Sequence, residues 1–259
     1  GAGTDTLNME INANVTDKFK SSNIEKVNVS TFGDNNIDMK NITGVETLTT
    51  KNSTGNITLN NIGDATLGFG FDGSSTNNIK ANYAAGKLSG TSDTLNIALN
   101  DAKAVSLVTP AGFETATINA TGTSDITTLT APGVSTYTVA GSGSVNFKDQ
   151  LKAITTVSAT GMTGALTTGK VDVTTGYVEH SITAGTNGAS VLLGAGNDNI
   201  GFSNASSATK SSTVKLGAGD DKLSLNTSGK GATYVFGEAG NDDVILSAGT
   251  LDAKDLIDL

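Results

Sequence analysis

Three turns built from glycine and aspartate recur near the end of the chain, and their spacing constrains the fold more than any other feature. They read GAGNDNI at 194–200, GAGDDKL at 217–223 and GEAGNDDV at 237–244. Asp198 precedes Asp221 by 23 residues, and Asp221 precedes Asp242 by 21. A repeat of about 20 residues is typical of a solenoid, in which each coil lies on the previous one. We therefore expect the three turns to stack, separated by about one strand spacing of roughly 4.8 Å.

The composition of these turns suits a hard cation. Glycine lets the backbone turn tightly, and aspartate supplies an anionic oxygen of the kind that Ca²⁺ prefers in a flexible loop. The candidate calcium ligands are Gly194, Gly196, Asn197, Asp198, Gly217, Gly219, Asp220, Asp221, Gly237, Ala239, Asn241, Asp242 and Asp243. The chain also opens on the same pattern at 1–7, which adds Asp5. A single Asn-Asp-Gly turn forms without metal, but three at coil spacing favour calcium.

These turns resemble the glycine- and aspartate-rich nonapeptides of RTX proteins, secreted bacterial proteins whose parallel β-rolls fold around calcium. The chain departs from that pattern where Leu193 and Leu216 replace the first glycine and Glu238 replaces the second. Its motifs also occur once per coil instead of in tandem. The resemblance implies Ca²⁺ as the cofactor, a type I secretion route and an extracellular, cell-surface location.

A second repeat occupies the first two thirds of the chain. The segment IEKVNV at 24–29 recurs as VETLTT at 45–50 and as FETATI at 113–118, and each looks like a turn that enters a strand. Such strands between RTX turns resemble RTX-type bacterial surface-layer proteins. That resemblance implies a structural segment that self-associates into a two-dimensional lattice and is held by an unidentified cell-surface anchor. An adhesin that binds host or glycan ligands is the alternative, and the non-catalytic part of a secreted enzyme is a third.

The fold class follows from composition and patterning. The chain has 259 residues with 32 Gly, 2 Pro, no Cys and 36% hydrophobic residues, and short alternating segments recur about every ten residues. We expect an all-β, right-handed parallel β-solenoid, with a surface-layer-type repeat region at 1–185 and a calcium-binding β-roll region at 186–259. β-Sandwich domains followed by a short β-roll are the alternative. Residues 145–157 are the best short helix candidate, and 252–256 could add one helical turn. The chain reads as a piece of a longer protein.

Several function classes are disfavoured. A net charge of −9 disfavours nucleic acid as a partner, and no apolar run is long enough to span a membrane. No zincin, nucleophile-elbow or phosphate-loop motif is present, so we expect no enzymatic activity. The segment 68–73 fits the letters of a dinucleotide-binding loop, but poor helix sequence follows it. His180 is the only histidine and lies in an alternating stretch typical of a strand.

Overall fold

The computed structural model is all-β and contains no helix among the residues that it describes. These are residues 3–73, 78–148, 151, 154–168, 171–172, 177–178, 182–184, 189–204, 210–227, 231–247 and 251–259. None of them forms a helix that could cross a membrane, in agreement with the sequence. The chain folds as a right-handed parallel β-solenoid and divides into two compact units, Gly1–Val134 and Ser135–Leu259. The predicted boundary at residue 185 separates two kinds of turn and stays a prediction.

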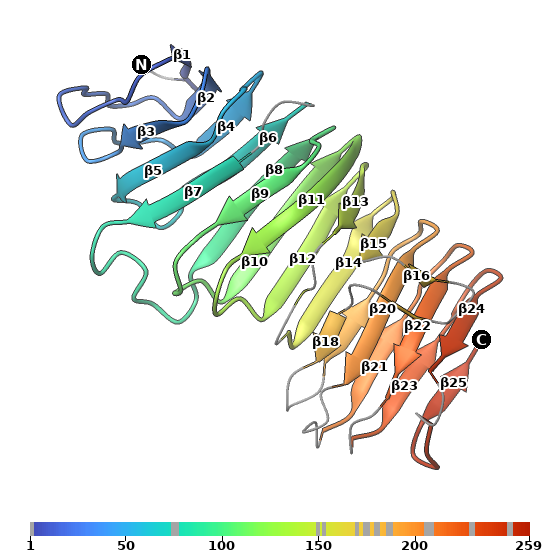
Figure 1. Cartoon of the computed structure of the whole chain (residues 1–259). Coiled ribbons are helices and arrows are strands. Elements are labelled where there is room, and N and C mark those ends of the chain that lie inside the picture. The colour runs from blue at the N-terminus through green and yellow to red at the C-terminus, as the bar shows by residue number, and fades with distance from the viewer. Residues whose placement is uncertain are drawn as a thin grey trace. The chain divides into compact units, whose positions relative to one another are not determined.

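In unit 1, successive strands from β2 onward alternate between two sheets, and every pairing between its described strands is parallel (Figure 1). Sheet A of this unit contains β1 (Thr6–Ile11), β2 (Lys26–Thr31), β4 (Thr47–Lys51), β6 (Gly68–Asp72), β8 (Thr94–Asn100) and β10 (Thr115–Thr121). Sheet B contains β3 (Asn35–Asp38), β5 (Ile57–Ile62), β7 (Asn78–Tyr83), β9 (Val105–Val108) and β11 (Thr123–Thr130). Two strands and their turns therefore make one coil.

Unit 2 repeats this arrangement. Its sheet A contains β12 (Thr136–Gly141), β14 (Thr156–Met162), β19 (Ser190–Leu192), β21 (Ser212–Lys215), β23 (Thr233–Phe236) and β25 (Leu256–Asp258). Its sheet B contains β13 (Ser144–Phe147), β15 (Leu166–Thr168), β20 (Asn199–Asn204), β22 (Lys222–Asn226) and β24 (Asp243–Leu246), and β18 (Ile182–Ala184) also pairs with β20. The short pair β16 (Val171–Asp172) and β17 (Tyr177–Val178) is antiparallel.

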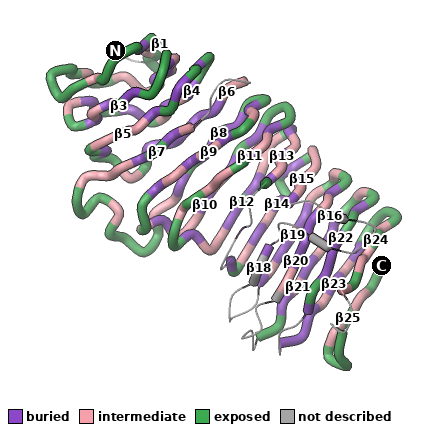
Figure 2. Tube along the Cα trace, viewed as in Figure 1, coloured by how far each residue is buried: buried purple, intermediate pink, exposed green. Residues whose placement is uncertain are grey.

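Apolar side chains at alternate positions fill each coil from the inside. Val27 and Val29 of β2 are at most 3% exposed, while the intervening Asn28 is only half-buried. Figure 2 shows this alternation along the strands of both units. The register places like residues over one another from coil to coil, as in the pair Ile97 and Ile118. Each coil thus buries its apolar face against the coils on either side, the general source of solenoid stability.

The coil period predicted from the sequence is confirmed. Thr6 pairs with Lys26, and Lys26 pairs with Thr47, so the repeats at 24–29 and 45–50 stack as successive coils. Segments 6–11, 26–30, 56–60, 94–99 and 136–139, which alternate in the sequence, all lie in or overlap strands. The alternative of sandwich domains is wrong, because the pairings between coils are parallel and not antiparallel.

The prediction of a helix over 145–157 is wrong at both ends of that segment, where the chain forms strands. Residues 144–147 form β13, and β14 begins at Thr156, while residues 149–150 and 152–153 lie outside the described part of the chain. Val145 and Phe147 alternate with exposed or half-buried neighbours at the strand period, and Val145 pairs with Leu166 of the next coil. The helical turn expected over 252–256 is not formed: the Asp255 N–H donates to the Asp252 carbonyl at 3.1 Å in a single tight turn, and Leu256 already belongs to β25.

The recurrent glutamates of the second repeat connect neighbouring coils. Glu25 accepts a hydrogen bond from the Asp5 N–H at 2.8 Å, and Glu114 accepts one from the Asp93 N–H at 2.9 Å. In each case the carboxylate satisfies a backbone donor at the start of the previous sheet A strand. In these two copies of the repeat, the acidic residue is therefore explained by a structural bond and not by a ligand.

This bond gives a prediction with an internal control. Replacing Glu114 by Ala should lower the free energy of unfolding by about 1 kcal/mol, because a partly buried N–H loses its charged acceptor. Glu46 occupies the same place in its repeat and is exposed, and Glu46→Ala should change stability by less than about 0.5 kcal/mol. Denaturant unfolding of both variants checks the prediction, and equal losses would contradict the role of the bond.

Candidate metal centre

The three glycine-aspartate turns stack at one corner of unit 2, where the chain enters sheet B. Asn199 pairs with Lys222, and Lys222 pairs with Asp243. The residues immediately before these are Asp198, Asp221 and Asp242, so the three aspartates occupy one position in successive coils. The spacing argument is therefore confirmed for these turns.

Backbone packing between the turns explains their glycines. The Ala218 N–H donates to the Gly194 carbonyl at 2.9 Å, which brings one turn directly onto the next. Gly219 has a φ of +140°, a value that L side chains rarely adopt, and a Cβ there would lie 2.6 Å from the Gly196 carbonyl oxygen. Gly240 has a φ of +143°, and its Cβ would collide with the Gly219 carbonyl oxygen. Only glycine allows this close stacking at both places.

The third turn stacks on the second in the register obtained by counting back from Asp242, and not forward from Gly237. A bridge between Ala218 and Ala239 places Gly240 on Gly219 and Glu238 on Gly217. Glu238 accordingly adopts a φ of +73° in the place where Gly217 has +97°. Gly240, which the list of candidate ligands omitted, is thus a structural member of the stacked turns. Counting back from Asp242, instead of forward from Gly237, would have found it.

One carboxylate oxygen of each aspartate is tied to the previous coil. The Asp221 Oδ1 accepts a hydrogen bond from the Asp198 N–H at 2.7 Å, and the Asp242 Oδ1 accepts one from the Asp221 N–H at 3.1 Å. At the start of the series, the Leu166 N–H donates to the Asp198 Oδ1. We call Asp198, Asp221 and Asp242 the carboxylate ladder.

The second oxygen of two ladder residues is buried without a partner. Asp198 is 3% exposed and Asp221 is 1% exposed, and the Oδ2 atom of each has no hydrogen-bond partner in the described structure. Burial, together with the charge of Asp221, raises the pKa of Asp198 to about 7, although the backbone N–H groups of Leu166 and Gly194 act to lower it. Burial also raises the pKa of Asp221, and the charges of Asp242 and Asp220 act in the same direction. A buried anionic oxygen without a donor requires either a proton or a cation.

A second series of hydrogen bonds, between exposed residues of successive coils, lies beside the carboxylate ladder. The Asp220 N–H donates to the Asn197 Oδ1 at 3.0 Å, and the Asn241 N–H donates to the Asp220 Oδ1 at 3.0 Å. Asp243 is also exposed, and its N–H donates to the Asp221 carbonyl at 2.9 Å. The side-chain oxygens of Asn197 and Asp220 thus accept backbone bonds between coils, which explains these residues without a metal.

The donor set fits calcium in kind. It consists of carboxylate and carbonyl oxygens, the ligands that Ca²⁺ takes in sixes to eights. Among the described residues, no group of three or more His, Cys, Asp or Glu side chains lies close enough together to hold a metal ion. An ion on the carboxylate ladder would therefore take most of its ligands from backbone carbonyls and water.

Two of the sequence candidates lie elsewhere. Asp5 precedes β1, a strand of sheet A in unit 1, whereas the ladder residues precede strands of sheet B in unit 2. Asp5 is exposed, and its N–H donates to Glu25. The structure therefore does not bring Asp5 to the ladder. His180 lies outside the described residues.

Comparisons of the chain with protein-family profiles, with characterised proteins and with solved structures find no match in any of the three.

Proposed function

We propose that this chain is a structural segment of a secreted, calcium-dependent surface-layer protein that forms a two-dimensional lattice on the bacterial cell surface. The observation that carries the calcium part is the pair of buried, unpartnered carboxylate oxygens on Asp198 and Asp221. They lie one coil apart on glycine turns whose backbones are in contact. The lattice part is supported by the resemblance of these turns and of the glutamate repeats to RTX-type surface-layer proteins.

Calcium would act here as a clamp between coils. Two neighbouring carboxylates of the ladder, such as those of Asp198 and Asp221, would hold it, together with carbonyls of the stacked glycine turns and water. The ion would neutralise like charges that otherwise raise one another's pKa. Because such a site forms only when the coils stack, ion binding and folding are coupled. Dissociation constants of extracellular calcium modules, about 0.1–1 mM, would make unit 2 loose at cytosolic calcium and ordered outside the cell.

Chelation tests the clamp. On removal of calcium from the full chain, backbone amides of β20, β22 and β24 should lose protection from hydrogen exchange by about 100-fold or more, since opening no longer has to displace the ion. Amides of β2, β4 and β8 in unit 1 should be unchanged. Elemental analysis of the purified protein should find bound calcium. Equal protection with and without chelator in β20 to β24 would contradict structural calcium.

An adhesin is the second candidate, and one feature of sheet A in unit 1 favours it. A shallow depression of about 170 Å³ lies over β6, where Gly68 leaves the outer surface low, and uncharged Thr47, Asn96, Thr117 and Asn119 border it. Hydroxyl and amide groups in that arrangement suit a hydroxyl-rich ligand such as a glycan. Ordered sheets in calcium, seen by electron microscopy, support the lattice role, whereas saturable glycan binding by the monomer supports the adhesin.

A further inference from the structure

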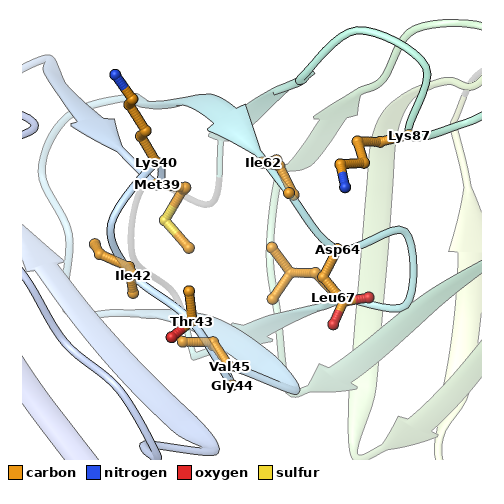
Figure 3. A pocket seen from close by; sticks show the side chains of 11 residues that line it. Met39, Lys40, Ile42, Thr43, Gly44, Val45, Ile62, Asp64, Leu67 and Lys87 are labelled. Carbon is orange, nitrogen blue, oxygen red and sulfur yellow. The ribbon is translucent and has the colours of Figure 1, made fainter.

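A cavity of about 370 Å³ opens on one side of unit 1 between the turns of successive coils. Its walls come from the connections β3 to β4 and β5 to β6, and Lys87 reaches it from the connection β7 to β8 (Figure 3). That last connection is long: Phe69 of β6 pairs with Ile97 of β8, 28 residues later, where Thr94 and Thr115 are 21 apart. The extra length lets residues 84–93 stand away from the coil and leaves the cavity open.

The floor of this cavity, which we call the Lys87 pocket, is apolar. It is lined by Met39, Ile42, Val45, Ile62 and Leu67, each at most 8% exposed. Figure 3 shows these side chains around the cavity. The volume lies within the range of about 300–1,000 Å³ that small-molecule sites occupy. An apolar group placed on these side chains would leave water without uncovering any buried polar atom of the floor.

The rim carries two lysines and one aspartate. Neither the Lys40 nor the Lys87 amine lies within 4.0 Å of a carboxylate among the described residues. Asp64 is anionic: its Oδ1 accepts bonds from the Thr66 N–H at 2.8 Å and the Thr66 hydroxyl at 2.7 Å, and these bonds, together with the charge of Lys87, lower its pKa. The charges of the two lysines and one aspartate that line the cavity sum to +1, in a chain whose overall charge is −9. In Figure 3 the Lys87 amine turns toward the cavity and the Lys40 amine turns outward.

We propose that the Lys87 pocket binds a small molecule with an apolar body and one anionic head group. The body lies on the five floor side chains, and the head group contacts the Lys87 amine. Apolar area supplies the affinity and the lysine selects the sign of the charge. The pocket contains none of the ladder residues, so ligand binding here does not depend on whether the ladder binds calcium.

The test uses octanesulfonate as the probe, with octyltrimethylammonium as its cationic match, and titration calorimetry on the full chain. Octanesulfonate should bind saturably at one site, about tenfold or more tightly than the cation. Lys87→Glu should weaken octanesulfonate about tenfold or more. Lys80→Glu, the same charge change at an exposed residue of β7, should leave it within about twofold.

A second variant tests the apolar floor. Gly63 lines the cavity, has no φ in the left-handed region and has nothing within 4 Å of an added Cβ, so Gly63→Leu should fold normally and occupy ligand volume. It should abolish binding with an unchanged melting temperature. Equal effects of Lys87→Glu and Lys80→Glu, equal binding of anion and cation, or no saturable binding at all would each overturn the proposal.

Discussion

In calcium, Asp221→Ala is expected to destabilise β20 and β22 by about 3 kcal/mol or more. Two losses add: the buried Asp198 N–H loses its charged acceptor, and the proposed ion loses one of the two carboxylates that hold it. In chelator the cost should fall below about 1 kcal/mol. There the substitution also removes a buried anionic oxygen that has no partner. Hydrogen exchange of the amides in these strands measures both values.

Asp5→Ala is the matched control, since Asp5 stands in the same sequence pattern but away from the ladder. Its carboxylate is exposed, and its backbone N–H keeps the bond to Glu25 in the variant. Its effect should stay within about 0.5 kcal/mol, with or without calcium. Equal effects of the two substitutions, or an Asp221→Ala effect that does not depend on calcium, would contradict the clamp.

The coil period and the stacked turns could be predicted because each depends on a spacing that a solenoid preserves. An Asp at residues 198, 221 and 242 can stack only if the coil is 21 to 23 residues long, and the register has this length. The helix prediction failed around Val145, where the three consecutive charged or polar residues Lys148, Asp149 and Gln150 looked helical and the strand before them, β13, has only four residues.

The details of the site depend on contacts that spacing does not reveal. Asp5 has the right neighbours in sequence, but its strand β1 lies in sheet A, whereas the strands that follow the ladder residues lie in sheet B. The first rung of the ladder joins Leu166 to Asp198 across 32 residues, because an excursion including β16, β17 and β18 interrupts the coil. The Lys87 pocket arises from a longer connection whose side chains carry no motif. Insertions of this kind are invisible to a search for periodicity.

The second large effect is a reversal of the pH dependence of unit 2 stability by calcium. Without calcium, the native pKa of Asp198 is about 7, compared with an ordinary value of 3.8. The native state therefore binds more protons than the unfolded state between these values, and stability falls as pH rises from about 4 to about 8. The difference is worth on the order of 4 kcal/mol. With calcium the ionised form is the one that binds, so stability should instead rise or stay level over the same range.

The substitution Asp198→Asn distinguishes the effect of protonation on stability from the effect of calcium binding. The amide oxygen can still accept the bond from the Leu166 N–H, and the neutral side chain no longer titrates. In chelator, the variant should lose the fall in stability and exceed the wild type at pH 8. In calcium it should be the weaker of the two, because a neutral amide replaces an anionic ligand. Unfolding of unit 2 followed by hydrogen exchange at pH 5 and pH 8 gives all four comparisons. If the wild type in chelator is equally stable at both pH values and calcium changes neither value, the buried oxygen of Asp198 carries neither a proton nor an ion, and the ladder is stabilised by hydrogen bonds alone.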